Sequence, residues 1–453
     1  MDYREAQQYL DSFVDYEKIP GIGFASADYS LDHVEELLRR LDNPQLVPKV
    51  VHIAGSKGKG SVAAMIASVL SAAGYRTGLY TSPHLHGLME RIRIDGRPAS
   101  EQEFADLVAQ LRPHLDELQN DSGYRPLTYF EALTVLAFVY FTRQEVDVLV
   151  CEVGLGGRLD ATNLVRPQVV VITPISLEHT QVLGSTLSQI AREKGGVIKT
   201  GSMVVSGPQP EEAAQVLREI CSAREAGLTE VGKDVHWTRT GKDLERQSFR
   251  VFAGDETYEL AMPLLGDYQL ENAATAVAAL RALDSTGVPV GREAIATGLA
   301  RVEWPGRFQV VRRAPLVLLD GAHTVASVER LVESIRSCLT YGRMFLVVGL
   351  SCDKDIPGIV KELVPLSPRV VATRSSHPRA APPEALAREF RAQGLAASGA
   401  PDVGKALSET LRVAAPDDLI CVTGSLFLVG EALDYLARSD SQQETPAPPE
   451  GGH

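Results

Sequence analysis

The chain has 453 residues, of which 44% are hydrophobic and 23% are charged, and its formal net charge is −13. This length predicts two or three domains, and the composition is typical of a globular protein rather than a disordered one. The negative charge argues against binding to nucleic acid or to an acidic membrane, although a local basic pocket can still bind an acidic small molecule.

The first residues, MDYREAQQYLDSF, are charged and lack an apolar centre, so they do not have the pattern of a signal peptide. No apolar run approaches the roughly 20 residues that span a bilayer. The five cysteines are scattered without a CxxC pair, which indicates reduced thiols. Together these features predict a cytoplasmic protein with neither a nucleic-acid partner nor a membrane partner.

The first predicted elements form a strand, a turn and a helix. Residues 31–42 have helical apolar spacing, and residues 49–55 (KVVHIAG) predict a short buried strand. A glycine-rich turn follows, and residues 61–74 (SVAAMIASVLSAAG) then predict a helix that ends at its glycine. A strand, glycine turn and helix in this order are typical of an α/β domain with a parallel sheet.

The later elements continue the α/β pattern. Residues 130–144 predict a buried helix, and strands are predicted at residues 146–153 and 167–173. Residues 233–260 alternate in polarity and predict antiparallel strands, whereas residues 266–283 predict a helix with an alanine-rich packing face.

A domain boundary is predicted near EWPGRF, where proline and glycine interrupt the pattern. The predicted division is an N-terminal domain of residues 1–304, a hinge of residues 305–309, a C-terminal domain of residues 310–438 and a disordered tail of residues 439–453. Strands of the second domain are predicted at residues 315–320, 343–350, 368–374 and 418–424. Ligands bind outside the carboxyl ends of such strands, so the turns that follow them are candidate site segments.

The segment GSKGKGS, from Gly55 to Ser61, is the candidate phosphate-binding loop. Glycines let the backbone approach phosphate oxygens, and N–H groups at a helix N-terminus favour anions. Lys59 is expected to meet the β- and γ-phosphates, and Ser61 is expected to cap the helix and to bind phosphate or metal. The segment departs from the standard GxxxxGK[ST] pattern because Gly60 separates the lysine from the serine. A plain glycine turn with a surface lysine is the alternative, but the flanking strand and helix favour phosphate binding.

Four later segments carry groups suited to a magnesium–nucleotide site. They are TSPHL with Ser82, CEVGLGGRLDATN with Glu152, LEHT with His179, and AREKGGVIK with Lys194. Glu152 is predicted at the carboxyl end of a strand, where it offers the hard oxygen ligand that Mg²⁺ prefers. Two alternatives stay open, because a lone histidine is more often structural, and Arg158 could form an ordinary turn ion pair with Asp160.

Taken in order, these segments resemble the folylpolyglutamate synthase/dihydrofolate synthase family, within the Mur-type ligases. The shared motifs run over most of the chain: GSKGKGS, TSPHL, LTYFEA, EVGLGGRLDATN, ISLEHT, EKGGVIK, NAATA, WPGRF, LDGAH, SCDKD and VTGSLFLVGE. Each motif is weak alone, whereas the ordered set is specific. The resemblance implies an α/β fold, in which an N-terminal P-loop-type ATP-binding domain with a mostly parallel sheet precedes a smaller, Rossmann-like α/β domain.

The resemblance also implies roles for individual residues. ATP would be bound by Gly55, Ser56, Lys57, Gly58, Lys59, Gly60, Ser61, Asn272, Arg307 and Asp320. One Mg²⁺ would be held by Ser82 and Glu152, and a second by Glu152, His179 and a carbamylated Lys194, with K⁺ as a further candidate ion. The implied catalytic residues are Lys59, Lys194, Arg307 and His323. The implied substrate-binding residues are Pro83, His84, Thr128, Phe130, Glu131 and Arg158.

The implied activity is ATP-dependent amide ligation by a monomer, with L-glutamate added to a folate and also to dihydropteroate. The acceptor carboxylate attacks the γ-phosphate of ATP, and the glutamate amine then displaces phosphate from the resulting acyl phosphate. Mg²⁺, Lys59, Arg307 and the loop N–H groups would neutralise the phosphate charge. His323 is a candidate helper for the incoming amine. Closure at the Pro305–Gly306 hinge would exclude water.

Three positions depart from the family's usual motifs. Lys57 stands where many bacterial relatives have Asn, Thr324 stands where Asn commonly follows DGAH, and Gly195 replaces the alanine after Lys194. The first two departures bear on which of the two ligations dominates.

Two alternative functions are weighed against the folate ligase. A peptidoglycan-type or cyanophycin-type Mur ligase would share the loop and the metal-binding segments, but LTYFEA and SPHL favour the folate branch. A switch or transport ATPase would need a standard P-loop with a hydrophobic strand ending in Asp, and it would also need a reason for the whole second domain. Neither is seen.

Overall fold

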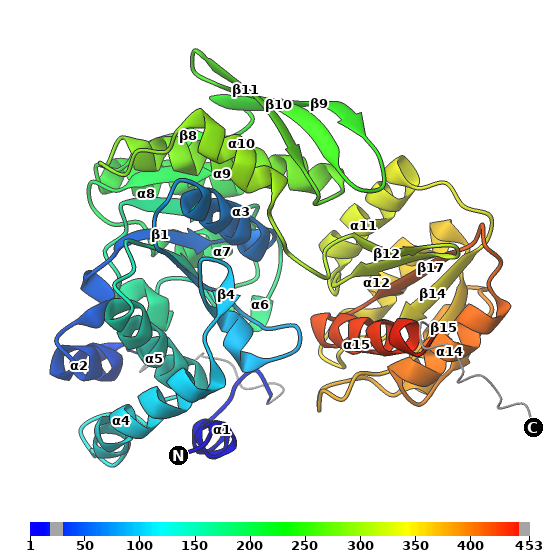
Figure 1. Ribbon diagram of the computed structural model, residues 1–453, viewed down its shortest axis with the longest axis horizontal. Coiled ribbons are helices and arrows are strands. Elements are labelled where there is room, and N and C mark those ends of the chain that lie inside the picture. The colour runs from blue at the N-terminus through cyan, green and yellow to red at the C-terminus, as the bar shows by residue number, and fades with distance from the viewer. Residues whose placement is uncertain (19–29, 444–453) are drawn as a thin grey trace, which may run out of the picture. The chain divides into compact units, whose positions relative to one another are not determined.

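The computed structural model describes residues 1–18 and 30–443, and the chain divides into two compact units, one of Met1–Trp304 and one that begins at Pro305. Each unit is built around its own sheet with helices packed against it (Figure 1). The predicted α/β class is therefore confirmed, whereas the hinge role of residues 305–309 stays a prediction. No helix of the described residues is long and apolar enough to cross a membrane.

An eight-stranded sheet forms the centre of the first unit, in the order β4-β3-β2-β5-β1-β6-β7-β8. Its strands are β1 (Lys49–Ala54), β2 (Thr77–Tyr80), β3 (Ile92–Ile94), β4 (Arg97–Pro98), β5 (Val148–Glu152), β6 (Val169–Ile172), β7 (Met203–Ser206) and β8 (Gly227–Glu230). In this order, each strand from β2 across the sheet to β8 pairs in parallel with its neighbours. At the other edge, β3 pairs antiparallel with β2, and β4 pairs antiparallel with β3. Strands β1 and β5 are almost entirely apolar because helices cover both faces of the sheet.

The helices of this unit form two layers. One face of the sheet packs against α3 (Lys59–Ala72), α9 (Asp267–Asp284) and α10 (Arg292–Ala300). The other face packs against α1 (Tyr3–Asp11), α2 (Asp32–Arg40), α4 (Glu101–Gln119), α5 (Tyr129–Arg143), α7 (Leu187–Gly195) and α8 (Glu211–Ala223). Strand β1 contributes Val51 and Ile53 to the first layer and Val50 and Ala54 to the second, since successive side chains alternate across a strand.

The predicted antiparallel region is a separate three-stranded sheet in the order β11-β10-β9. Its strands are β9 (Val235–Lys242), β10 (Gln247–Ala253) and β11 (Glu256–Met262). Phe249 and Val251 of β10 join the apolar cluster that contains α9. The polarity alternation of residues 233–260 is explained by this arrangement, because one face of the small sheet is buried and the other is solvated.

The second unit has a six-stranded sheet in the order β12-β13-β17-β14-β15-β16. Its strands are β12 (Gln309–Arg313), β13 (Leu316–Asp320), β14 (Met344–Val348), β15 (Arg369–Ala372), β16 (Ala397–Gly399) and β17 (Leu419–Thr423). Only β12 pairs antiparallel within this sheet of described residues. Its helices are α11 (Val325–Cys338), α12 (Ile356–Leu363), α13 (Pro383–Ala392), α14 (Val403–Val413) and α15 (Leu426–Gln443).

Short helices complete both units. They are α6 (Thr180–Leu183) and the 3₁₀ helices η1 (Pro44–Leu46), η2 (Leu88–Arg91), η3 (Ala161–Leu164) and η4 (Val364–Leu366).

The predicted start of α3 is wrong. The helix begins at Lys59, and its N-cap is Gly58, whose φ of 90° lies in the left-handed region. Glycine adopts this conformation without the steric cost of a Cβ atom, so the turn closes two residues earlier than predicted. Ser61 therefore lies inside the first helical turn and does not cap the helix.

The predicted start of the tail is also wrong. Helix α15 extends to Gln443, so residues 439–443 are helical instead of disordered. Each residue added to an existing helix gains one backbone hydrogen bond, and the first proline after Arg438 comes only at position 446. The rest of the predicted tail, residues 444–453, lies outside the described residues.

Candidate active site

The predicted phosphate loop connects β1 to α3, and its glycines are required by close packing. A Cβ atom at Gly55 would overlap Thr173, and one at Gly58 would overlap the Asn272 side chain. Both glycines also have positive φ angles, 144° for Gly55 and 90° for Gly58. The loop is therefore pressed between the end of β6 and the first turns of α9, where a larger residue would displace it.

The first half of the loop is hydrogen-bonded to the turn that follows β6. The backbone N–H groups of Ser56 and Lys57 both donate to the Pro174 carbonyl, at 3.1 Å each. The Ser56 hydroxyl donates to the Ser176 carbonyl and accepts from the Ser176 N–H, again at 3.1 Å. Lys57 Nζ lies 2.9 Å from Glu178 Oε1. These two loop amides are thus already satisfied by protein acceptors.

The second half of the loop leads directly into a helix start. The first α-helical hydrogen bond runs from Val62 N to the Gly58 carbonyl, at 2.9 Å. The N–H groups of Lys59, Gly60 and Ser61 precede it and have no intrahelical acceptor. Among the described residues no side chain caps this helix. These amides therefore offer the donors and the positive dipole end that bind a phosphate.

Helix α9 and Trp304, the last residue of the first unit, contact the start of α3. Gln269 Nε2 donates to the Ser61 hydroxyl at 3.4 Å and Asn272 Nδ2 donates to Gln269 Oε1 at 2.9 Å. A Cβ atom at Gly60 would lie 2.7 Å from the Trp304 ring. Asn272, predicted as a nucleotide contact, thus lies beside the loop.

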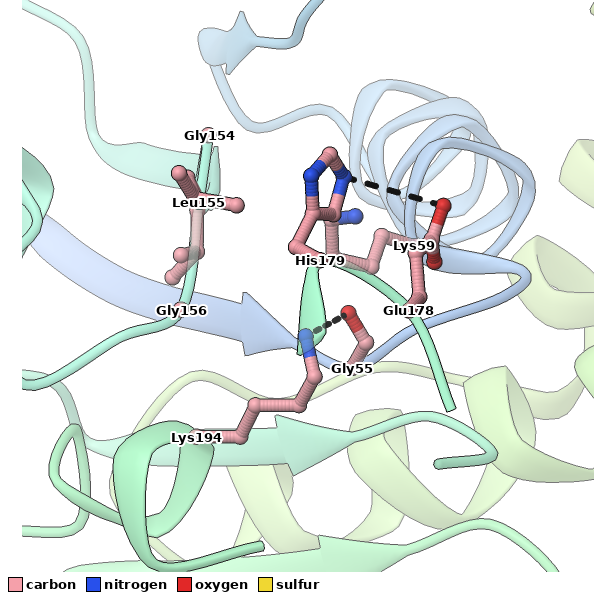
Figure 2. A pocket seen from close by; sticks show the side chains of 9 residues that line it. Gly55, Lys59, Gly154, Leu155, Gly156, Glu178, His179 and Lys194 are labelled. Carbon is pink, nitrogen blue, oxygen red and sulfur yellow. Dashed lines mark hydrogen bonds and ion pairs between the residues drawn. The ribbon is translucent and has the colours of Figure 1, made fainter. Parts of the chain in front are cut away.

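A small cavity of about 40 Å³ lies next to the loop, and Figure 2 shows it from close by. It is lined by Gly55, Lys59, Val153, Gly154, Leu155, Gly156, Glu178, His179 and Lys194. Most of these residues follow the carboxyl ends of β1, β5 and β6, which is where parallel sheets bind ligands. The structure therefore brings three predicted site residues, Lys59, His179 and Lys194, to one cavity.

Lys194 is buried in helix α7, with an exposed fraction of 5%. Its Nζ donates to the Gly55 carbonyl at 2.7 Å, as Figure 2 shows. Burial, followed by the charge of Lys59, lowers the pKa of Lys194 to about 7, while Glu178 opposes the shift. A substantial fraction of this amine is therefore neutral near pH 7.

Glu152 ends strand β5 and is buried. Its Oε2 accepts the Ser82 N–H at 3.2 Å, and its Oε1 lies 3.8 Å from Lys59 Nζ. The predicted metal ligands Ser82 and Glu152 are thus adjacent, and the loop lysine reaches the same carboxylate. Pro83 follows Ser82 and is exposed.

His179 is not a buried structural histidine, since its side chain is 43% exposed and it lines the cavity. Its Nε2 lies 3.8 Å from Glu178 Oε1. Glu178 was not among the predicted site residues, although it directly precedes His179 in LEHT, in the turn that follows β6. Within the described part of the chain, no three His, Cys, Asp or Glu side chains form a preformed metal cluster.

Two of the predicted substrate residues are engaged in a helix cap. Thr128 is the N-cap of α5, and its N–H donates to Glu131 Oε2 at 2.8 Å. Glu131 also bonds to His33, at 3.2 Å, and to Arg125. Burial raises the pKa of Glu131, but the bonds from His33 and Arg125 outweigh it and lower the pKa to about 2. A substrate role for these two residues stays a prediction.

Phe130 and His84, two further predicted substrate residues, contact different parts of the first unit. A Cβ atom at Gly154 would lie 2.5 Å from the Phe130 ring, so Phe130 packs behind the glycine turn of the cavity. His84 Nδ1 accepts from Arg91 Nε at 3.0 Å, and the Arg91 guanidinium is held by both carboxylate oxygens of Glu17. Burial, followed by the Arg91 charge, lowers the pKa of His84 to about 4.

The alternative ion pair between Arg158 and Asp160 is wrong. Arg158 Nη2 lies 2.9 Å from Glu193 Oε1 on the protein surface. Asp160 is buried and accepts the N–H groups of Leu155, at 2.9 Å, and Thr162, at 3.0 Å. A buried carboxylate is stabilised here by backbone donors, so it holds the glycine turn in shape instead of pairing with an exposed arginine.

In the second unit, Asp320 lies at the carboxyl end of β13 and is buried. Its Oδ2 accepts the Phe308 N–H at 2.8 Å, and its Oδ1 accepts the Ala322 N–H at 2.9 Å. The carboxylate therefore joins the start of β12 to the turn after β13.

Arg307 and His323 lie on the two segments that Asp320 joins. Arg307 Nη1 donates to the Gly306 carbonyl at 3.3 Å, and a Cβ atom at Gly321 would lie 2.7 Å from the same nitrogen. His323 Nδ1 donates to the Gly321 carbonyl at 2.8 Å, because a carbonyl only accepts. The predicted residues of the second unit thus meet at one strand end.

Two family models match the chain, the Mur ligase middle domain over residues 53–280 and the Mur ligase, glutamate ligase domain over residues 306–426. These matches, on this fold and loop, define the chain as a Mur-type ligase. It is 31% identical to the dihydrofolate synthase/folylpolyglutamate synthase of Bacillus subtilis, over 95% of this chain and 98% of that protein. The chain belongs to the folylpolyglutamate synthase/dihydrofolate synthase family, as its motifs predict.

Solved structures support the same family. A Mycobacterium tuberculosis folylpolyglutamate synthase complexed with ADP has a TM-score of 0.88 and 31% identity, over 95% of this chain and 97% of that one. Escherichia coli FolC in complex with DHPP and ADP has a TM-score of 0.84 and 30% identity, over 97% and 99%.

A longer relative comes from Halobacterium salinarum, described as a probable bifunctional folylpolyglutamate synthase/dihydropteroate synthase. It is 37% identical over 98% of this chain, but the chain spans only 53% of that protein's length.

Proposed function

We propose that this chain is an ATP-dependent ligase that adds L-glutamate to a folate, and also to dihydropteroate, through an acyl phosphate. The observation that carries the proposal is the meeting of an uncapped helix start with Lys59, His179 and Lys194 at one cavity. The names of the relatives include both activities, and solved relatives were complexed with ADP, AMPPCP, DHPP or folate.

The residues at the loop fit a magnesium–nucleotide complex. Mg²⁺ binds proteins through one or two carboxylates and completes its shell with water and phosphate oxygens, so a preformed cluster is not required. Glu152 would supply the carboxylate and Ser82 the neighbouring hydroxyl. The ion, when bound, neutralises charge that would otherwise oppose attack by a carboxylate. Lys59 and the α3 amides would hold the phosphates themselves.

A second magnesium ion would need a further ligand, and Lys194 fits this role as a carbamate. Carbon dioxide reacts with a neutral amine, and burial provides that form by lowering the pKa of Lys194 to about 7. The carbamate is carboxylate-like, and with Glu152 and His179 it would hold the second ion. K⁺ is a further proposed cofactor, with no residue assigned to it.

The second unit would supply the remaining polar contacts. Arg307 would bind phosphate, and Asp320 would contact the nucleotide. Since His323 Nδ1 donates to a carbonyl, its Nε2 carries the lone pair in the neutral ring. That nitrogen would accept a proton from the attacking glutamate amine.

The acceptor substrate would lie near Pro83, His84, Thr128, Phe130, Glu131 and Arg158. Phe130 is the best supported of these, because its ring packs on the glycine turn that lines the cavity. We further propose a cytoplasmic monomer, consistent with five free cysteines and a net charge of −13.

The test is ATP-dependent incorporation of labelled L-glutamate, with 7,8-dihydropteroate and tetrahydrofolate as alternative acceptors. The proposal expects incorporation with both, and little ATP hydrolysis until acceptor and glutamate are present together. Incorporation with neither acceptor would overturn it. ATP hydrolysis that needs neither acceptor nor glutamate would favour the switch ATPase instead.

A further inference from the structure

Lys57 makes a side-chain contact that its predicted phosphate role does not require. Its Nζ lies 2.9 Å from Glu178 Oε1, and the two side chains are 26% and 12% exposed. Among the described residues that line the cavity, Glu178 is present and Lys57 is not. The lysine therefore reaches the cavity through a carboxylate.

The same carboxylate oxygen also faces a predicted metal ligand. Glu178 Oε1 lies 3.8 Å from His179 Nε2, so one oxygen atom stands between the loop lysine and the histidine. A carboxylate that accepts the ring N–H of a metal-binding histidine fixes the orientation of that ring, and the present separation of 3.8 Å is an ion-pair distance from which such a bond could form. Figure 2 shows Glu178 and His179 facing each other at the cavity.

The backbone keeps the two ends of this ion pair together. Lys57 and its neighbour Ser56 donate to the Pro174 carbonyl, and Ser56 bonds twice to Ser176. Lys57 and Glu178 thus project from two segments that are already joined by four hydrogen bonds. A partly buried pair between fixed segments loses little side-chain entropy on forming, unlike a surface pair.

We propose that Lys57 is a positioning residue that acts through Glu178 to orient His179. Phosphate is not its partner. The inference rests on the proposed function, because it assumes a metal–nucleotide complex at this cavity. An asparagine at this position would carry no charge and could not form this ion pair.

The test compares metal binding with nucleotide binding in four variants. Lys57→Met removes the charge and keeps the length, Lys57→Arg restores the charge, and Glu178→Gln removes the acceptor. Lys233→Met is the matched control, because Lys233 pairs with Glu230 at 3.2 Å and its side chain is 56% exposed. The readouts are Mn²⁺ affinity by electron paramagnetic resonance with ADP present, and ADP affinity in EDTA by calorimetry.

We expect Lys57→Met and Glu178→Gln each to weaken Mn²⁺ binding by about tenfold, at the lower end of the range for outer-shell residues of metal sites. ADP affinity in EDTA should not change, and Lys57→Arg should restore Mn²⁺ affinity. A fifth variant, which combines Lys57→Met with Glu178→Gln, should bind Mn²⁺ no more weakly than Glu178→Gln alone. In steady state, the KM for Mg²⁺ should rise more than kcat falls.

A loss of ADP affinity in EDTA for Lys57→Met, with Mn²⁺ affinity unchanged, would show a phosphate contact and overturn the proposal. Unchanged values of both affinities would also overturn it. If Lys57→Met fails to fold, Glu178→Gln tests the same pair from its other end. Glutamate incorporation by the wild type is measured separately, so a failed ligase assay is distinguished from a failed role for Lys57.

Discussion

Two of the chain's strand–turn–helix segments differ in the chemistry of the helix start. Strand β1 leads through Gly58 into α3, which no described side chain caps. Strand β13 leads into α11, where Thr324 is the N-cap and its hydroxyl accepts the Ser327 N–H at 3.4 Å. The first unit thus leaves helix amides available for an anion, whereas the second satisfies one of them internally.

The two turns also differ in charge, and the difference favours an anion at the first turn. The turn after β1 carries Lys57 and Lys59, whereas β13 ends in Asp320, whose carboxylate is occupied by two backbone N–H groups. A parallel strand followed by a helix therefore occurs in this chain both with and without an uncapped helix start. The site requires an uncapped helix start and a glycine that brings the backbone close.

The largest expected effect comes from Lys59→Ala. Lys59 lines the cavity, and its removal deletes one charge that stabilises the developing phosphate. We expect a loss of ligation of at least about 10²-fold to 10³-fold, as for other preorganised donors, with the fold intact by circular dichroism. Labelled-glutamate incorporation measures it. Full turnover in this variant would refute the loop assignment.

Gly58→Ala tests whether the close packing of the loop against Asn272 is required for nucleotide binding. The new methyl would overlap Asn272, so we expect ADP affinity to fall by about tenfold or more as the loop shifts. Gly74→Ala is the matched control, because Gly74 has the same φ of 90° and nothing within 4 Å of the new Cβ. Both variants carry the left-handed strain of about 1–2 kcal/mol, so only steric displacement separates them. Equal ADP affinity in the two variants would contradict a requirement for this close packing.

Lys194, which donates a hydrogen bond to Gly55 in the turn after β1, is expected to form a carbamate in a pH-dependent manner. Its pKa is lowered to about 7, so its neutral fraction rises from about a tenth at pH 6 to about nine tenths at pH 8. Carbamate formation should rise across the same interval, measured by ¹³C NMR with labelled CO₂. Lys194→Ala should lose this signal, and activity lost in that variant should be partly rescued by short carboxylates. A flat signal between pH 6 and 8 would contradict the prediction.

The same shift links Lys194 to stability. The unfolded lysine keeps its proton up to its ordinary pKa of 10.5, whereas the folded one loses it near 7. Since the unfolded state binds more protons between these values, the contribution of Lys194 to folding stability becomes more favourable as pH rises from about 7 to about 10.5.

The smallest effect is expected at the capped helix start. Thr324→Ala removes the N-cap of α11 and should cost about 1 kcal/mol of unfolding free energy, measured by urea denaturation. Thr324→Asn should retain most of this stability, since asparagine also caps helices. An equal loss in both variants would show that the cap contributes nothing. The capping ability that the two residues share also explains why threonine can stand where the family's motif commonly has asparagine.

Much of the fold follows from local patterns. The apolar runs of β1, β5 and β6 predict buried parallel strands, and the alternation of residues 233–260 predicts the antiparallel sheet. The start of α3 was not predictable, because nothing in the residue pattern shows that Gly58 has a left-handed φ. The extent of α15 was missed because its last residues are polar, although a helix already formed continues through such residues.

The residues of the candidate active site were predicted only in part, and from the family resemblance instead of from local patterns. Lys59, His179 and Lys194 lie in separate motifs, and the family resemblance rather than any local pattern placed them together. Glu178 was missed because its importance comes from contacts with Lys57 and His179. Those contacts depend on how β1 and β6 pair in the sheet.

The packing of Trp304 on Gly60 has a practical consequence. The chain has only two tryptophans, Trp304 and Trp237 of β9. Among the described residues Trp304 Nε1 has no hydrogen-bond partner, and the Arg93 guanidinium lies 5.6 Å from the ring. Its emission is therefore sensitive to small movements of the loop residue beneath it. With Trp237→Phe, the remaining indole would report movements of Gly60, and thus the arrival of the proposed nucleotide, without any attached dye.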